Sequence, residues 1–521
     1  MVSAVARSSI MFAAEAPQVS MFCDDGNHDR FAPTKHNSMC QRRSVLDVIL
    51  KHQDFNSNNQ INNVNNDQLV DTTIRITYKK QNLTRYVFVL ENTKDMMQRD
   101  SWNYLRLALK YWALTTMPDN SEVGIVLAED TSKKLLDIVS VKNNNKDEGS
   151  NRDKFYSKIP YTPTDTLRPG CLDCAIKDAA DMLIERTKNH GAANNVIVVI
   201  AAGMNPSEQL TKVMEKVKKA KIKVATITYP TMMRSDLLNP LAEQTGGVAY
   251  TVFERKLNVD TTLLSTYFEL KNALNDIVQR FYSGTIADLP IEIHRREITD
   301  DGRSSITGSF MFDTTVGKPS QFTFFTHNSV TPLIKSLKLV SPSLQTFSER
   351  NDRYLDLKMI RLTANISESG TWTYSVEPYP GNPQPHFLQV TATPISATAP
   401  VVRARFWTHK NQPNGPLILL VEVKKGEIPV LGAKVEVTVT KPEINGSYPH
   451  KNHLELLDTG AGDPDITKGD GVYTKYFSAS DSGPGLYNFE VVVTDNGNTA
   501  YTWTDSAKFD GEFSNSLTFR N

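Results

Sequence analysis

Three oxygen-bearing side chains alternate along a short segment, Glu91, Thr93 and Asp95, which directly follows a β-branched and aromatic run ending at Leu90. Carboxylate and hydroxyl oxygens at alternate positions of one loop can converge on Mg²⁺, which prefers oxygen ligands in an octahedral array. The same residue types also cap helices, because short oxygen side chains accept hydrogen bonds from the amides of a first helical turn. The segment therefore predicts either a magnesium site or the start of a helix.

A second acidic segment lies between residues 458 and 470, where aspartates alternate with glycines. Ca²⁺ takes about six to eight oxygen ligands in flexible loops of this composition, although the spacing is not that of an EF-hand. The alternative is a tight turn in which Asp side chains accept backbone hydrogen bonds and Gly supplies positive φ. The candidate calcium ligands are Asp458, Asp463, Asp465 and Asp470.

Most motifs of enzyme active sites are missing from the sequence. It has no His-Glu-x-x-His, no phosphate loop and no Gly-x-Gly-x-x-Gly after a predicted strand. The nearest zinc-like pair, His450 and His453, falls where a neighbouring proline and asparagine predict a turn. Cys171 and Cys174 have the spacing of a redox pair, which is also compatible with buried thiols or a local structural bridge. We therefore expect this chain not to be an enzyme.

Alternating strands and helices must position these segments. The pattern predicts a mostly parallel, doubly wound sheet covered by helices on both faces. Ligands of such sheets bind beyond the carboxyl ends of the strands, so the loops after Leu90, Ala128 and Ala201 are the expected site. The predicted strands are 86–90, 123–128, 195–201, 222–228 and 247–252, and the predicted helices are 102–112, 172–185, 208–220, 234–244 and 260–281.

Composition narrows the function classes. The chain has 521 residues with 58 basic and 58 acidic side chains, and this zero net charge argues against nucleic acid as a partner. Its longest apolar runs fall well short of the roughly 18–20 residues that cross a bilayer as a helix, which disfavours a helical channel. The short apolar stretch near Met1 is too brief for a signal peptide, so we expect a start inside a longer protein.

Two features point to an extracellular setting. Cys23 and Cys40 close a segment that reads as one loop and could form one disulfide. Asn82, Asn365 and Asn445 each begin an Asn-x-Ser/Thr triplet, the acceptor sequence for N-glycosylation. Both features favour secretion.

Four stretches of the chain carry a resemblance to a known family. The order of elements and the segment from Leu241 to Gly247 look like a von Willebrand factor A-type domain. The whole chain resembles the calcium-activated chloride channel regulator family, from just after that family's metalloprotease catalytic region into its second β-sandwich. The matching stretches are Ser9-Ile10-Met11-Phe12 with Phe22-Cys23, Met39-Cys40 with Arg43-Ser44-Val45-Leu46-Asp47-Val48-Ile49, the A-type domain, and Leu456-Leu457-Asp458-Thr459-Gly460-Ala461-Gly462 with Asp470-Gly471-Val472-Tyr473.

The resemblance, the change to short alternating segments after residue 281 and the Asn-rich stretch at 56–67 together predict the domain organisation. An A-type domain of doubly wound α/β class precedes two all-β sandwich domains. The predicted boundaries are 1–55 for the remnant of a Cys-containing N-terminal region, 56–81 for an Asn-rich linker and lead-in, 82–283 for the A-type domain, 284–394 for a β-sandwich and 395–521 for a fibronectin III-like β-sandwich.

The sequence departs from the family pattern at the magnesium loops. A-type domains that bind Mg²⁺ use Asp-x-Ser-x-Ser on the first loop, Thr on the second and Asp on the third. Here the first loop carries Glu91, Thr93 and Asp95, the Thr position falls at about Gly170, and the third loop reads Ala201-Ala202-Gly203. Glu is one methylene longer than Asp, which suits the strict Mg²⁺ octahedron poorly. We expect weak or no metal binding, with Asp165 and Asp173 as candidate substitute ligands.

The resemblance implies a secreted or cell-surface accessory glycoprotein. It would modulate calcium-activated chloride conductance by binding a membrane channel or another cell-surface or matrix protein through its A-type domain. One alternative is a matrix-binding adhesion protein that depends on Mg²⁺ or Ca²⁺. Another is the non-catalytic part of a larger self-cleaving metalloprotease, and a cytosolic A-type protein is a further alternative.

Overall fold

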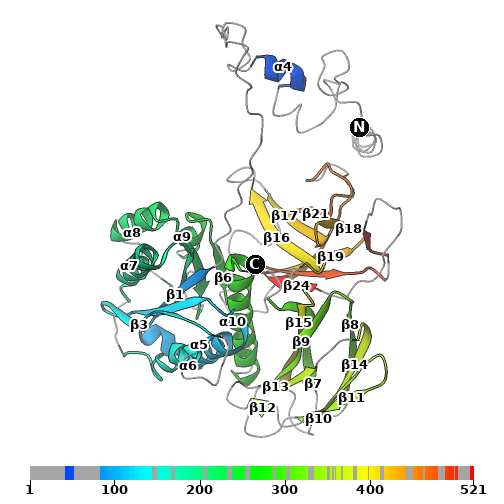
Figure 1. Cartoon of the computed structure of the whole chain (residues 1–521), viewed down its shortest axis with the longest axis horizontal. Coiled ribbons are helices and arrows are strands. Elements are labelled where there is room, and N and C mark those ends of the chain that lie inside the picture. Colours follow the sequence, from blue (N-terminus) through cyan, green and yellow to red (C-terminus); the bar gives the residue numbers. More distant parts are fainter. Residues whose placement is uncertain are drawn as a thin grey trace, which may run out of the picture.

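In the computed structural model of the chain (Figure 1), the described residues form one α/β region and a set of antiparallel sheets. A six-residue helix, α4 (Val45–Leu50), precedes them. The described ranges are 41–51, 83–142, 150–165, 170–203, 208–230, 238–252, 259–284, 289–300, 305–326, 334–348, 353–354, 357, 359–364, 368–378, 384–396, 398–410, 416–441, 450–460, 464–478, 487–497, 499–502 and 517–520.

A six-stranded mixed sheet forms the centre of the α/β region, with the strand order β3-β2-β1-β4-β5-β6. All neighbouring pairs are parallel except β2 and β3, which are antiparallel. Every residue of β1 and β2 is buried, as expected for strands covered on both faces. The strands are β1 (Thr84–Glu91), β2 (Glu122–Ala128), β3 (Ser132–Ser140), β4 (Asn194–Ala201), β5 (Lys223–Thr228) and β6 (Val248–Thr251).

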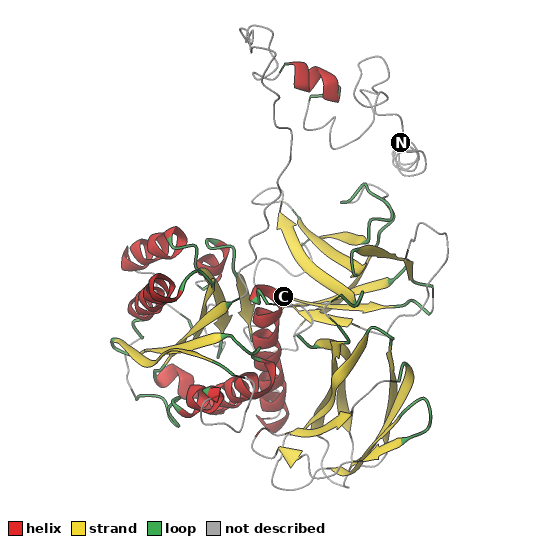
Figure 2. Cartoon of the chain, in the orientation of Figure 1, coloured by secondary structure: helices red, strands yellow, loops and turns green. Residues whose placement is uncertain are grey.

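Helices cover both faces of this sheet (Figure 2). Tyr86, Phe88 and Leu90 of β1 pack in the cluster that includes α5 and α10, whereas Val87 and Val89 pack with α7 and α8. This alternation follows from the two-residue period of a strand. The helical segments are η2 (Lys94–Asp100), α5 (Ser101–Tyr111), η3 (Trp112–Thr116), α6 (Arg152–Ser157), α7 (Leu172–His190), α8 (Glu208–Lys219), α9 (Asn239–Glu243) and α10 (Val259–Phe281).

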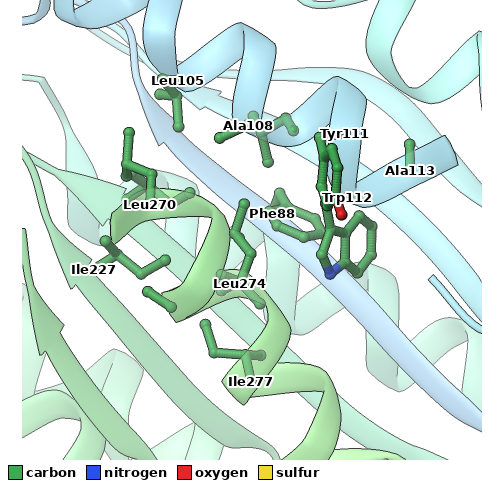
Figure 3. Packing of buried hydrophobic residues seen from close by; sticks show 14 of the residues in the cluster. Phe88, Leu105, Ala108, Tyr111, Trp112, Ala113, Ile227, Leu270, Leu274 and Ile277 are labelled. Carbon is green, nitrogen blue, oxygen red and sulfur yellow. The ribbon is translucent and has the colours of Figure 1, made fainter. Parts of the chain in front are cut away.

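Aromatic side chains fix η3, which continues α5, and α6 on the sheet (Figure 3). The ring of Phe88 meets the ring of Trp112 edge-on at a centroid distance of 4.8 Å and that of Phe155 at 5.1 Å. From the opposite side, Leu270 and Leu274 of α10 close the same cluster, because residues four apart lie on one helix face. The segment that follows the oxygen-rich loop is therefore firmly anchored.

The segment from Leu241 to Gly247 ties α9 to β5. Thr245 Oγ1 accepts the backbone N–H of Val224 at 3.0 Å. Gly246 has φ of 64°, and a Cβ on Gly247 would stand 1.8 Å from the carbonyl oxygen of Val224. Both glycines are therefore required by the backbone, one by its positive φ and the other by close approach.

Sequence patterns missed two elements of this region and misassigned one segment of the antiparallel sheets. Strand β3 was not predicted, because the exposed Lys133 and Lys134 at this sheet edge hide its apolar pattern. Helix α6 is too short to show helical periodicity. The predicted turn at His450 and His453 is wrong, because both residues lie in β20 (His450–Leu456).

Beyond α10, nine strands form two antiparallel sheets, with the orders β11-β10-β14-β8 and β12-β13-β9-β15-β7. The rings of Phe310 in β8 and Phe322 in β9 lie 6.0 Å apart, so the two sheets contact through their apolar faces. The strands are β7 (Ile291–Asp300), β8 (Ile306–Phe312), β9 (Val316–Thr326), β10 (Ile334–Val340), β11 (Thr346–Ser348), β12 (Arg353–Tyr354), β13 (Met359–Ala364), β14 (Gly370–Pro378) and β15 (Gln384–Pro394).

Two further antiparallel sheets follow, β16-β17-β18-β23 with β21 beside β17, and β20-β19-β22-β24. The rings of Phe406 in β16 and Phe489 in β22 lie 5.8 Å apart, which again brings two sheets together. The remaining strands are β16 (Val402–Lys410), β17 (Leu417–Lys425), β18 (Ile428–Leu431), β19 (Lys434–Lys441), β21 (Val472–Phe477), β22 (Asn488–Thr494), β23 (Tyr501–Thr502) and β24 (Leu517–Arg520).

Helix α10 lies between the mixed sheet and the antiparallel sheets (Figure 1). Phe268 stacks on Phe387 of β15 at a centroid distance of 4.5 Å. Lys271 is fully buried and donates from Nζ to Gln389 Oε1. Asn488 in β22 donates from Nδ2 to the carbonyl of Thr251 at 3.2 Å, so the last sheets also contact the α/β region.

Candidate functional site

The loops that follow β1, β2 and β4 meet at the carboxyl edge of the mixed sheet. The backbone N–H of Asn92 donates to the carbonyl of Ala128 at 2.9 Å, and the Asn92 side chain donates to Glu129 Oε1 at 2.8 Å. The backbone N–H of Ala202 donates to Glu91 Oε2 at 2.8 Å. The convergence of these loops agrees with the prediction for a parallel sheet.

Glu91 is the most buried acidic group at this edge, with 5% of its surface exposed. Besides the bond from Ala202, its Oε1 accepts the hydroxyl proton of Thr93 at 2.9 Å. Burial raises the pKa of Glu91 above its ordinary value, and the hydrogen bonds from Ala202 and Thr93 oppose that rise. Both carboxyl oxygens are thus engaged by donors of the protein itself.

The other two predicted ligands of the first loop differ in their surroundings. Thr93 is buried, and its carbonyl accepts the backbone N–H of Met96 at 3.1 Å. Asp95 is exposed in the first turn of η2. A helix therefore begins directly after Thr93, while the side chains of Glu91 and Thr93 bond to each other and to Ala202, so side-chain capping of this turn stays a prediction.

The second loop offers no oxygen ligand where the resemblance places one. A Cβ on Gly170 would stand 2.7 Å from the carbonyl oxygen of Ala128 and 3.2 Å from Thr93 Cγ2, so a threonine does not fit there without movement. Asp165 is exposed and lies 3.6 Å from Lys94 Nζ.

Asp173, the second candidate substitute, lies in the first turn of α7 beside Cys171 and Cys174. These three residues are the sole group of at least three His, Cys, Asp or Glu ligands that comes together within the described part of the chain. The two cysteines form a disulfide with Cα atoms 5.3 Å apart, so they offer no thiolate. The local bridge, one of the two structural alternatives for this pair, is the one formed. Among the residues that the structure describes at this edge, the oxygen groups do not fit Mg²⁺.

The close approach of Gly170 to the backbone of Ala128 leads to a prediction. Gly170→Ala should destabilise the α/β region by about 1–3 kcal/mol, because the new Cβ overlaps the backbone of Ala128. Urea unfolding followed by circular dichroism measures this loss. Gly124→Ala is the matched control, since the nearest atom there is the mobile end of Met182, 3.1 Å away, and a smaller loss is expected. Equal losses for both variants would contradict the proposed overlap.

The C-terminal acidic segment adopts a tight, internally bonded turn. Asp458 accepts the backbone N–H groups of Gly469 at 2.7 Å and Gly471 at 3.0 Å, and both glycines have positive φ. Asp465 accepts the N–H of Thr467, and Asp470 accepts that of Val472, each at 2.9 Å. Side chains that bond to the backbone in this way are those of the turn alternative.

Charge crowding persists in this turn. Burial raises the pKa of Asp470 to about 6, and the nearby carboxylates of Asp465 and Asp458 add to the rise. Even so, the described aspartates do not bring three ligand atoms within 4.8 Å of one another. Several predicted site residues lie outside the described residues, namely Cys23, Cys40, Asn82, Asn365, Asn445 and Asp463.

Two exposed apolar side chains at the same edge were not singled out from the sequence. Met97 in η2 is 39% exposed, and Tyr161, on the segment that leads to Asp165, is 82% exposed. The guanidinium of Arg106 lies 4.2 Å from the centre of the Tyr161 ring. An aromatic residue between Pro160 and Pro163 signals an exposed loop, and this was the available clue.

Comparison with known proteins gives two family matches. A model described as calcium-activated chloride channel N terminal matches residues 2–62, and one described as von Willebrand factor type A domain matches residues 87–262. Within the described residues, no helix combines the length and apolarity needed to span a membrane.

Similar proteins align with most of the chain. Calcium-activated chloride channel regulator 1 of Bos taurus is 26% identical over 505 residues, which covers 96% of this chain and 51% of that protein. Calcium-activated chloride channel regulator 4 of Homo sapiens is 25% identical over 501 residues, with coverages of 95% and 49%. The chain thus spans about half the length of the curated relatives it matches. A solved von Willebrand factor type A structure from Catenulispora acidiphila covers 73% of this chain and 66% of that chain, at 10% identity and a TM-score of 0.28.

Proposed function

Because the chain belongs to the family of calcium-activated chloride channel regulators and contains a von Willebrand factor type A domain, we propose that it is an accessory protein that binds another protein through this domain. This binding would modulate calcium-activated chloride conductance. The site of action would be outside the cell or at its surface. The partner would be a membrane channel or another cell-surface or matrix protein.

The arrangement of the domain's carboxyl edge is the observation that carries this proposal. One face of the A-type domain is occupied, because α10 covers that face of the sheet and packs on β15 of the neighbouring sheets. The carboxyl edge instead presents Met97 and Tyr161, together with the charged side chains of Lys94 and Asp95. Exposed aromatic and Met side chains with a polar surround are typical of protein-binding surfaces.

The antiparallel sheets would act as spacers or docking modules. We propose that they form two β-sandwich domains, 284–394 and 395–521, the second fibronectin III-like. In support, strands from two sheets contact through aromatic rings in each region. Spacing a binding domain from its anchor is a role that sandwich domains perform on many surfaces.

We also propose that these residues do not hydrolyse peptide bonds. The sequence lacks His-Glu-x-x-His, the motif that supplies the zinc ligands and the general base of zinc metalloproteases. A larger metalloprotease that includes this chain remains compatible with the proposal. Metal-dependent adhesion is not favoured, because the residues at the carboxyl edge do not fit Mg²⁺.

Patch-clamp recording tests the proposed function. Purified full chain added to cells that express a calcium-activated chloride channel should change the calcium-activated chloride current. Tyr161→Ala should raise the concentration needed for half of the effect by at least about tenfold, because a central aromatic contact is typically worth 2 kcal/mol or more.

Leu344→Ala is the matched control, since Leu344 is 81% exposed but lies in the turn after β10. It should act like the wild type. An absent effect of the wild-type chain would count against channel modulation. Equal potency of Tyr161→Ala and wild type would count against binding through the carboxyl edge.

A further inference from the structure

The Glu91 side chain connects two loops that the sheet alone does not join. Glu91 ends β1, and its backbone pairs with Ala128 of β2. Its carboxylate reaches in the other direction, to the loop after β4, where it accepts the backbone N–H group of Ala202. The hydroxyl of Thr93 supplies a second donor from its own loop. One buried carboxylate thus binds donors from both sides of the edge.

These donors engage both of the oxygens that a cation would need. Backbone N–H groups carry partial positive charge toward Glu91 Oε2, which repels a cation and satisfies the carboxylate. The proton of Thr93 points to Oε1, and its methyl group faces Gly170. The third loop, Ala201 to Gly203, has no side-chain oxygen at all.

Side-chain length explains how the carboxylate spans the gap. Neighbouring strands lie about 4.8 Å apart, so a side chain at the end of one strand must extend to reach amides beyond the end of the next. Glu has one methylene more than Asp, so its carboxylate lies further from the backbone. That longer reach suits the strict Mg²⁺ octahedron poorly. The residue that departs from the metal-binding pattern is therefore the one suited to reach across.

We propose that the Glu91 carboxylate is a fixed structural clamp in place of a divalent cation. It holds the loop after β1 against the loop after β4, and this edge of the sheet keeps its shape without metal. This inference does not rest on the proposed function, since it concerns the stability of the edge and not its partner.

Two measurements on the full chain test the clamp. Isothermal titration with Mg²⁺, and separately with Ca²⁺, should give the same heats for wild type and Glu91→Gln. Identical heats would mean that no ion binds to Glu91. Amide hydrogen exchange at Ala202 should be slow in the wild type, and equally slow with Mg²⁺ or EDTA. It should be at least about tenfold faster in Glu91→Gln, because hydrogen bonds to a charged acceptor are the stronger ones.

Asp95→Asn is the matched control, since Asp95 is an exposed carboxylate four residues away, and it should leave exchange at Ala202 unchanged. Thr93→Val, which keeps shape but removes one donor, should speed exchange less than Glu91→Gln. It also provides a readout if Glu91→Gln does not fold. Saturable Mg²⁺ binding that Glu91→Gln abolishes, or slow exchange that appears only with Mg²⁺, would overturn the clamp.

Discussion

Replacing Glu122 with alanine should destabilise the A-type domain by about 3–5 kcal/mol, because the change leaves a buried arginine without its partner. Arg85 is fully buried, and its Nε donates to Glu122 Oε2 at 2.5 Å. Arg186 of α7 donates to the other carboxyl oxygen, also at 2.5 Å. Urea unfolding of the full chain, followed by circular dichroism, gives the change in free energy.

The position of this group in the fold accounts for the size of the effect. Arg85 is the second residue of β1 and Glu122 is the first of β2, so their ion pair joins the central strand to its neighbour at the amino edge of the sheet. Arg186 extends the contact to α7, and Ser140 of β3 donates to Glu122 Oε1 at 3.2 Å. One carboxylate therefore holds three strands and a helix.

A surface ion pair provides the matched control. Asp181 lies 36% exposed beside Lys216 and Lys177, and Asp181→Ala should cost at most about 1 kcal/mol. Similar losses for Asp181→Ala and Glu122→Ala would show that the buried network contributes no more than an exposed pair.

Acid should weaken the same network in the wild type. Burial acts to raise the pKa of Glu122, but the hydrogen bonds and charges of Arg186 and Arg85 outweigh it, and the pKa lies below its usual value. The stabilisation is therefore complete above the ordinary Glu pKa and is lost as pH falls through the lowered one. The stability difference between wild type and Glu122→Gln should shrink over that range. A difference that stays constant on acidification would contradict this linkage.

The central strands of the α/β region could be predicted because their sequences are almost entirely apolar. The run from Tyr86 to Leu90 is wholly apolar, and a wholly apolar short run suits a parallel strand covered on both faces. Strand β3 gives the opposite case. It is the edge strand of the sheet, and Lys133 and Lys134 are exposed. Its sequence therefore resembles that of a loop.

The candidate site was predictable in place but not in chemistry. The position of the loops follows from strand order, which the alternation of elements reveals. What Glu91 binds depends instead on the backbone amide of Ala202, 111 residues further along the chain. Backbone donors have no signature in a sequence, so the carboxylate could be identified there as a candidate ligand but not as a group satisfied by the protein itself.

The contact between the A-type domain and the antiparallel sheets was equally hidden from sequence patterns. Phe325 of β9 belongs to an alternating strand and would pass as a residue of its own β-sheet core. In the structure its ring packs against rings of the A-type domain, with centroid distances of 5.5 Å to Phe268, 5.9 Å to Tyr111 and 6.1 Å to Tyr267. The ammonium of Lys271 lies 5.0 Å from the centre of the same ring.

Phe325→Ala should therefore destabilise the chain by about 3–5 kcal/mol, the usual cost of truncating a fully buried Phe. The loss should fall on the contact between regions, because the ring also shields the buried Lys271. Hydrogen exchange along α10 should accelerate together with the drop in urea midpoint.

Leu344→Ala, at an 81% exposed position of the same antiparallel region, should change stability by no more than about 0.5 kcal/mol. If exchange in α10 stays at the wild-type rate in Phe325→Ala, the helix is held by the A-type domain alone and the two regions are independent. If it accelerates, the antiparallel sheets form part of the core on which α10 is built.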